Sequence, residues 1–132
     1  MTATRIRLLD SDVMIDLQRS FPPAVAWYNS VPSGTLALPG HALMELYQDA
    51  RNTAQNRVID EITAPFPIIW PTDEEALKAV ANFRLLHLSQ GVGLIDTLIA
   101  ATALSLNAPL CTFNHKHFCH IPGLVIEQPY TR

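Results

Sequence analysis

Residues 94–106 read LIDTLIAATALSL, and this stretch decides which class of fold the sequence can adopt. It follows the break at residues 91–93, is long enough for a helix, and carries one acid, Asp96, among apolar residues. Short apolar runs elsewhere alternate with helical patterns. We expect strands within residues 6–9, 35–38, 66–70, 110–113 and 124–126, and helices within 14–20, 24–30, 41–51, 54–63, 72–88 and 94–106. This alternation predicts an α/β fold with a largely parallel sheet.

The composition is typical of one globular domain spanning residues 1–132. Hydrophobic residues make up 48%, and the formal net charge of −3 gives no whole-protein attraction for nucleic acid. Any RNA would need a local basic rim. The candidates for that rim are Arg19, Arg51, Arg57, Arg84 and Lys116. Two cysteines are too few for a disulfide framework, and no apolar run is long enough for a signal peptide or a membrane span. We therefore expect a soluble cytoplasmic protein.

Three acids lie in apolar surroundings. Asp10 follows the apolar run at residues 6–9, Glu45 lies within ALMELY, and Asp96 lies within the most apolar helix. Each has a local explanation open to it, since Asp10 can cap the next helix and Asp96 gains up to about 1 kcal/mol in a first helical turn. A partly buried carboxylate otherwise shifts its pKa, finds a partner or binds a metal.

Convergence of the three acids would require a cation. Each pair of carboxylates at about 4 Å repels by about 4 kcal/mol at an effective dielectric constant near 20. The end of the first strand, which Asp10 follows, is the edge where parallel sheets bind ligands. Oxygen ligands favour Mg²⁺ or Mn²⁺ over zinc. The sequence thus raises the hypothesis of a divalent-metal site built by Asp10, Glu45 and Asp96.

Four segments resemble the motifs of PIN domains, in the family's order. They are LLDSDVMIDL (residues 8–17), ALMEL (42–46), LIDTLIAATA (94–103), and CTFNHKHF (111–118) followed by IPGL (121–124). Size and pattern are similar to the VapC-like toxins of bacterial type II toxin–antitoxin pairs. The resemblance covers nearly the whole chain and implies a three-layer α/β/α fold with a mostly parallel central sheet of four to five short strands.

The resemblance also implies a function and a set of site residues. Asp10, Glu45 and Asp96 take the metal-binding positions, and Asp12 takes an auxiliary one. The family hydrolyses RNA as a Mg²⁺- or Mn²⁺-dependent endoribonuclease with a metal-activated water, leaving a 5′-phosphate and a 3′-hydroxyl. It forms homodimers and is inhibited by a small antitoxin protein. The helix with Trp27 and Tyr28 is the one expected to contribute to those contacts.

The segment after residue 110 departs from the family at one position. Asn114 falls among the catalytic positions where many members carry a fourth acid, so we expect one firmly held ion, with a second joining only alongside the RNA phosphate. Thr112 is expected to position a water or a phosphate through its hydroxyl. His115, Lys116 and His117 are expected to form a loop near the site.

Two other functions remain open. The first is a PIN fold that no longer cleaves, because of Asn114, and acts as an RNA- or antitoxin-binding module. The second is a phosphatase of the haloacid dehalogenase type, suggested by Asp10-Ser11-Asp12-Val13, although the late acidic pair of that chemistry is missing. A zinc cluster around Cys111 and Cys119 is disfavoured because the spacing matches no closed zinc pattern.

Two further expectations concern single faces of helices. Asp16 lies four residues after Asp12 and is expected at the surface. Ala76, Val80, Phe83 and Leu86 or Leu88 recur at helical spacing, which predicts that they form the buried face of their helix.

Overall fold

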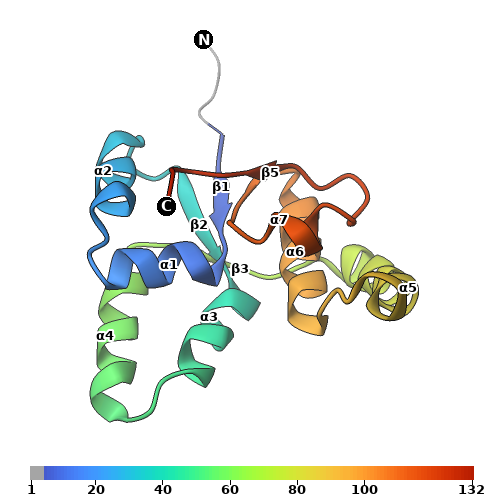
Figure 1. Cartoon of the computed structure of the whole chain (residues 1–132), viewed down its shortest axis with the longest axis horizontal. Helices are drawn as coiled ribbons and strands as arrows, with labels where there is room; N and C mark the ends of the chain where they lie inside the picture. The colour runs from blue at the N-terminus through green and yellow to red at the C-terminus, as the bar shows by residue number, and fades with distance from the viewer. Residues whose placement is uncertain (1–4) are drawn as a thin grey trace.

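The structure is a computed structural model that describes residues 5–132 (Figure 1). Of the N-terminal segment considered for a signal peptide, residues 1–4 lie outside the described part. The elements in chain order are β1 (Arg7–Leu9), α1 (Ser11–Gln18), α2 (Pro22–Ser30), β2 (Leu36–Pro39), α3 (Gly40–Gln48), α4 (Thr53–Thr63), β3 (Ile68–Ile69), α5 (Asp73–Gln90), α6 (Leu94–Leu106), β4 (Leu110–Cys111), α7 (His115–Phe118) and β5 (Ile126–Glu127). This order confirms the predicted alternation of strands and helices.

The five strands form one sheet in the order β3-β2-β1-β4-β5, and every neighbouring pair is parallel. In register, Leu8 of β1 lies opposite Ala37 of β2 on one side and Leu110 of β4 on the other. All the strands therefore end at the same edge of the sheet. The chain moves outward from β1 to β3 and then returns past β1 to β4, so β1 and β4 flank the point where the strand order reverses.

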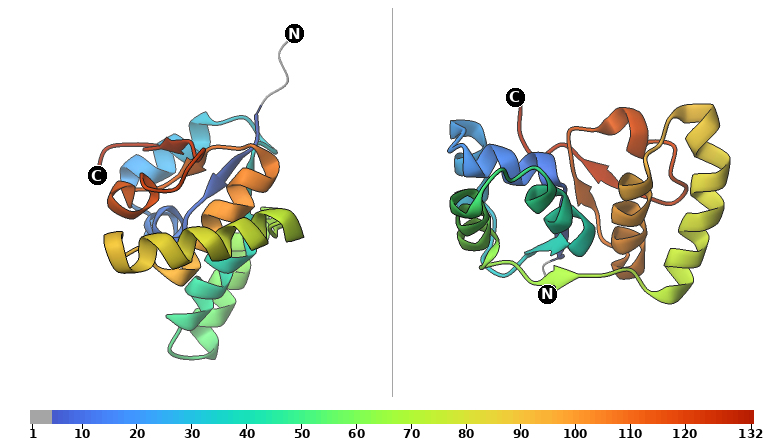
Figure 2. Two further views of the ribbon diagram at one scale, coloured as in Figure 1. Left: turned by 90° about the vertical axis from the view of Figure 1, so that its right-hand side faces the viewer. Right: turned by 90° about the horizontal axis from the view of Figure 1, so that it is seen from below.

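The helices cover both faces of the sheet, which gives the predicted three layers. Helices α1 to α4 gather on one side, whereas α5 and α6 lie together on the other (Figures 1 and 2). Parallel strands need such crossovers, and the right-handed rule assigns the outward and returning connections to opposite faces. Among residues 5–132, no helix combines the length and apolar character that a membrane crossing requires.

Helix α6 matches its predicted bounds because both of its ends are marked in the sequence. Gly93 precedes it in an extended conformation, and Asn107 ends it in the left-handed region with φ 50°. Small side chains let α6 pack closely between the sheet and α5, where Ala100 and Ala103 are fully buried. The first turn of this helix, with Asp96, is thereby held against the rest of the core.

Some boundaries differ from the prediction. Helix α1 begins at Ser11 rather than residue 14, because the Asp10 side chain caps it by accepting a hydrogen bond from the Ser11 amide at 2.8 Å. Residues 115–118 form the short helix α7 rather than a loop. Strand β3 keeps only two of the five predicted residues, and Pro67 lies immediately before it.

The expectation that the apolar positions of α5 form its buried face is wrong for Val80, and of the alternatives Leu86 and Leu88 only Leu86 packs against the core. Val80 and Leu88 are 66% and 91% exposed, whereas Ala79 is the buried residue of this helix. A single helix at the outer side of a layer can bury only a narrow stripe against α6. The remaining apolar side chains form an exposed surface on α5.

Gly40, the first residue of α3, is required by a close approach. The indole ring of Trp70 lies over it, and a Cβ at position 40 would overlap the ring. Trp70 also packs edge-on against His41, with ring centroids 5.1 Å apart. The glycine thus lets the segment after β3 lie directly against the start of the helix that carries Glu45.

Candidate active site

The predicted site residues lie at the common carboxyl end of the strands. Asp10 directly follows β1, Thr112 directly follows β4, and Glu45 lies one turn into α3, the helix that follows β2. Asp96 lies in the first turn of α6. The topology therefore delivers side chains separated by as many as 102 positions to one edge of the sheet.

The Thr112 hydroxyl joins two of the acids. It donates a hydrogen bond to Asp10 Oδ2 at 2.8 Å and lies 3.3 Å from Asp12 Oδ2. Thr112 is 1% exposed and Asp10 is 4% exposed, so this contact is shielded from solvent. Asp12 Oδ2 also accepts a hydrogen bond from the Phe113 amide at 2.9 Å. The end of β4 thus fixes the orientation of both carboxylates.

Glu45 is oriented by a residue that the sequence did not single out. The Ser11 hydroxyl donates to Glu45 Oε1 at 3.1 Å, which ties α3 to the start of α1. Ser11 lies between Asp10 and Asp12, so the same helical turn positions three carboxylates. A short polar side chain next to two acids was the available signal, but its partner is 34 residues away.

Asp96 is held by two side chains from the segment after β4. Asn114 Nδ2 lies 3.4 Å from Asp96 Oδ2, and His117 Nδ1 lies 3.4 Å from the same oxygen. The structure therefore brings Asn114 beside Asp96. The contact of His117 was missed, because the helical turn that brings this imidazole to the site was interpreted as a loop.

Burial raises the pKa of all four acids, and repulsion by neighbouring acids adds to this at Asp10 and Glu45. Burial raises the pKa of Asp10 from 3.8 to about 7, and the charge of Asp12 adds to the effect. The pKa of Glu45 is raised by burial and by the charge of Asp96, and the pKa of Asp96 is raised by burial despite His117. The charges of Asp12 and Glu45 act on Asp10, and the charge of Asp96 acts on Glu45, so the acids form one electrostatic cluster.

The chemistry of this cluster fits an oxygen-preferring divalent cation. One oxygen of Asp12, Oδ1, is buried and has no hydrogen-bond partner among the described residues. Such an atom next to carboxylates with raised pKa values is suited to a cationic partner. Within residues 5–132, however, no three His, Cys, Asp or Glu side chains form a ready-made ligand set. Convergence of Asp10, Glu45 and Asp96 on one ion therefore stays a prediction.

The expectation of a surface position for Asp16 is wrong. Asp16 is 8% exposed, and its carboxylate accepts hydrogen bonds from Tyr130 Oη at 2.8 Å and Arg132 Nε at 2.9 Å. Burial opposes its ionisation, but these hydrogen bonds outweigh burial and lower the pKa of Asp16 below 3.8. The chain after β5 covers the face of α1 that was expected to meet solvent.

Two of the five candidates for a basic rim lie beside different helices. Arg19 lines a pocket beside α1, whereas Arg84 lines a groove between α5 and α6. A guanidinium that does act on the carboxylates belongs to Arg132, whose charge lowers the pKa of Asp12 against the effect of burial. Arg132 was not among the predicted residues.

The raised pKa of Asp10 generates a pH prediction for the metal-free protein. Because the folded protein keeps a proton on Asp10 up to about pH 7 and the unfolded chain releases it near 3.8, this group stabilises the fold most at low pH. That stabilisation is lost as the pH rises through about 7. Between pH 5 and pH 8 we expect the wild type to lose about 2 kcal/mol of unfolding free energy relative to Asp10→Asn.

Urea unfolding of both proteins in EDTA measures this difference. An asparagine amide can donate to the Thr112 hydroxyl, which can turn to donate to Asp12. The substitution therefore keeps Thr112 hydrogen-bonded to both side chains. Parallel pH dependences for the two proteins would show that Asp10 ionises normally in the fold.

Comparison with known proteins identifies the family. The PIN domain family model matches residues 7–124. The curated Ribonuclease VapC10 of Mycobacterium tuberculosis (strain CDC 1551 / Oshkosh) is 35% identical over 113 residues, which cover 84% of each chain. Among solved structures, VapBC-1 from nontypeable Haemophilus influenzae matches with TM-score 0.76 and 26% identity, covering 94% of this chain and 98% of that one. A toxin–antitoxin complex from Klebsiella pneumoniae matches with TM-score 0.74 and 28% identity, covering 96% and 99%. The chain therefore belongs to the PIN domain family.

Proposed function

We propose that this chain is a metal-dependent endoribonuclease, the toxin of a type II toxin–antitoxin pair. The observation that carries the proposal is the electrostatic cluster of Asp10, Asp12, Glu45 and Asp96 at the carboxyl edge of the sheet. Each of these acids has a raised pKa, and Asp10 is almost fully buried. The similarity to Ribonuclease VapC10 supports RNA as the substrate.

The residues that would hold Mg²⁺ or Mn²⁺ are Asp10, Glu45 and Asp96, and Asn114 lies beside Asp96. The ion, when bound, supplies a Lewis acid that polarises the scissile phosphate and lowers the pKa of the attacking water. The chain's own contribution is orientation. Thr112 holds Asp10, and Ser11 holds Glu45, each through one hydroxyl hydrogen bond.

Asn114 and His117 orient Asp96. Because position 114 carries an amide, the cluster has four acids and no fifth. Both contact Asp96 Oδ2, so this oxygen is held and Oδ1 is left for other partners. A cluster in which Asn114 brings no charge is suited to one firmly held ion. A second ion would have to bring its negative partner with it, and the RNA phosphate is such a partner.

The substitution Asp96→Asn tests the activity. We expect cleavage of single-stranded RNA to fall at least about 100-fold, because a metal ligand is removed. The unfolding free energy in EDTA is not expected to fall, because burial already penalises the charged form of Asp96. Gel-based cleavage assays and Mn²⁺ titration calorimetry measure the two properties.

A matched control is Asp73→Asn. Asp73 lies in the first turn of α5, as Asp96 does in α6, but it is exposed and lies outside the cluster. Full activity of Asp96→Asn would remove Asp96 from the mechanism. If the wild type binds RNA but neither Mn²⁺ nor Mg²⁺, the chain is an inactive binding module. If it hydrolyses a chromogenic phosphomonoester and leaves RNA intact, it is a phosphatase.

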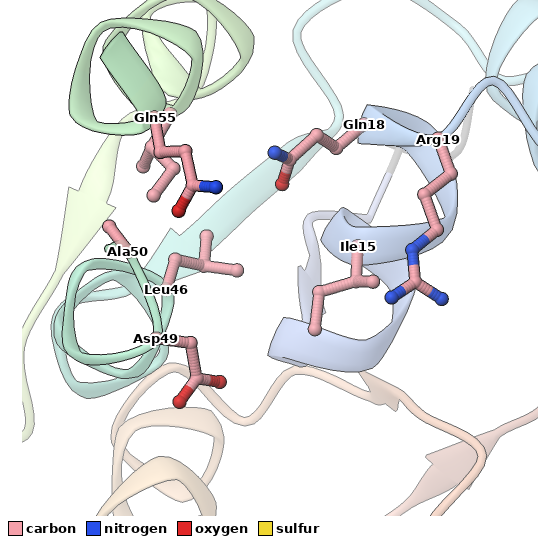
Figure 3. Close-up of a pocket in the computed structure, with 8 residues that line it drawn as sticks. Ile15, Gln18, Arg19, Leu46, Asp49, Ala50 and Gln55 are labelled. Atoms are coloured by element: carbon pink, nitrogen blue, oxygen red, sulfur yellow. The ribbon is translucent and has the colours of Figure 1, made fainter. Parts of the chain in front are cut away.

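A pocket of about 200 Å³ between α1, α3 and α4 suits the antitoxin (Figure 3). Its lining combines an apolar floor with a polar rim of both charges: Ile15, Leu46, Ala50 and Ile59 with Gln18, Arg19, Asp49 and Gln55. Apolar anchors surrounded by polar groups are the anatomy of a protein interface. The similarity to a solved toxin–antitoxin complex supports this occupant.

The substitution Gln18→Trp tests the pocket. An indole placed at its rim fills the space, so we expect affinity for the cognate antitoxin to fall at least about 10-fold. RNA cleavage by the isolated protein should not change. Calorimetric titration measures the affinity. Gln48→Trp, at an exposed position of α3 outside the lining, is the control. Equal affinities of the two variants would place the antitoxin elsewhere.

The exposed apolar surface of α5 suits a second copy of the chain. A groove of about 290 Å³ between α5 and α6 is lined almost wholly by apolar atoms, Phe83 and Leu98 among them. Leu77 and Leu88, 72% and 91% exposed, flank this groove on α5. The groove and these two leucines lie side by side on α5. In a two-fold dimer the leucines of each copy would pack into the groove of the other, which makes the surface self-complementary.

Val80→Glu tests the dimer. Val80 lines the groove and is 66% exposed, so the charge should leave the isolated fold intact and convert the dimer to a monomer. Light scattering coupled to size-exclusion chromatography measures the mass. Val125→Glu introduces the same charge at a residue that is 56% exposed beside β5 and should remain dimeric. A dimeric Val80→Glu protein would rule out this surface.

A further inference from the structure

The segment after β5, residues 128–132, returns across the molecule toward α1 (Figure 1). Sequence motifs assign it no role, and it follows the last strand of the sheet. Its side chains nevertheless donate hydrogen bonds to two residues of α1, Asp12 and Asp16. Those contacts lead, in a short series of steps, to the carboxylates of the site.

The first step anchors the segment on α1. Arg132 donates to both oxygens of Asp16, from Nε at 2.9 Å and from Nη2 at 3.1 Å, and Tyr130 Oη donates to Asp16 Oδ2 at 2.8 Å. A two-point pairing of guanidinium and carboxylate fixes orientation as well as distance. Asp16 is largely buried beneath the two side chains, so water competes little for its oxygens.

The second step places both anchored side chains on Phe113. The Arg132 guanidinium lies over the Phe113 ring at 4.3 Å from its centroid, and the Tyr130 ring packs against it at a centroid distance of 4.9 Å. Guanidinium and aromatic groups attract a ring in these arrangements. Phe113 is therefore held between the segment and the body of the protein.

The third step connects Phe113 to the site. The Phe113 amide donates to Asp12 Oδ2 at 2.9 Å, and Arg132 Nη2 lies 3.4 Å from the Asp12 carbonyl oxygen. Asp12 Oδ2 lies within reach of the same Thr112 hydroxyl that holds Asp10. Displacement of Phe113 would thus move a donor to Asp12 and, with it, the end of β4 that orients Asp10.

We infer that Tyr130 and Arg132 are positioning residues that hold the Asp12–Phe113 hydrogen bond, and through it the carboxylate cluster, in its working geometry. The inference rests on the proposed function for its catalytic consequence. Arg132 is occupied rather than free to bind RNA: its Nε and Nη2 donate to Asp16 and its face covers Phe113. Because the Arg132 guanidinium already contacts Asp16 and Phe113, it acts on the site through these two residues.

The test uses Arg132→Gln and Tyr130→Phe in the full chain. Each is expected to weaken Mn²⁺ binding about 10-fold, the usual effect of removing a group that supports a ligand, and to lower kcat with little change in KM. Hydrogen exchange of the Phe113 amide should become faster in both. Calorimetry, cleavage kinetics and exchange followed by NMR measure the three effects.

Two controls separate positioning from a general loss of stability. Arg7→Gln removes an arginine of similar exposure that pairs with a carboxylate, Arg7 Nε to Glu127 at 3.1 Å, and should leave Mn²⁺ affinity and Phe113 exchange unchanged. In an Asp12→Asn background, Arg132→Gln should cost no further Mn²⁺ affinity. The Asp12 carboxylate, through which Arg132 acts on the cluster, is already absent.

The outcomes distinguish this inference from the proposed function. A wild type that cleaves RNA and binds Mn²⁺, with variants that match it in affinity, kcat and exchange, overturns the inference alone. A wild type that neither binds Mn²⁺ nor cleaves RNA overturns the proposed function. In that case unchanged exchange of the Phe113 amide in Arg132→Gln would overturn the positioning role, and faster exchange would support it.

Discussion

The structure depends on a set of like-charged side chains that the sheet brings to one edge. Two carboxylates at about 4 Å repel by about 4 kcal/mol at an effective dielectric constant near 20, and burial adds to that cost. The fold meets the cost with hydrogen bonds from Thr112, Ser11 and the Phe113 amide, and by keeping Asp10 protonated up to about pH 7. These donors orient the acids but do not neutralise them. The carboxyl edge of the sheet therefore carries an excess of negative charge once these acids ionise.

Thr112 has the central place among the donors because one buried hydroxyl serves three groups. It donates to Asp10, lies near Asp12 and accepts from the backbone amide of Asn114 at 3.0 Å. A hydroxyl can do this because it has one proton and two lone pairs, whereas valine of the same shape can do none of it. Stability and function are coupled at this residue, because the hydrogen bonds that stabilise the buried acids also set their positions.

Much of the fold could be predicted because its signals are local. The turn before Leu94 and the apolar spacing after it mark α6, and the acids at positions 10, 45 and 96 stand out from their immediate neighbours. The contacts of Asp16 could not be predicted, because Tyr130 and Arg132 lie 114 and 116 positions away and no local pattern reports such a partner. The exposure of Val80 was missed for another reason. Apolar residues at helical spacing indicate a face that is covered, but they do not tell whether the same chain covers it.

Asn114 and His117 set the electrostatic surroundings of Asp96 from the segment after β4. An acid at position 114 would face Asp96 as a like charge, whereas the Asn114 amide donates to it at 3.4 Å. His117 reaches the same oxygen and lowers the pKa of Asp96 against the effect of burial. The two side chains therefore reduce the repulsion within the cluster without occupying the buried Oδ1 of Asp12. The hydrogen bonds from the segment after β4 therefore offset part of the negative charge of Asp96 without a change in the other three acids.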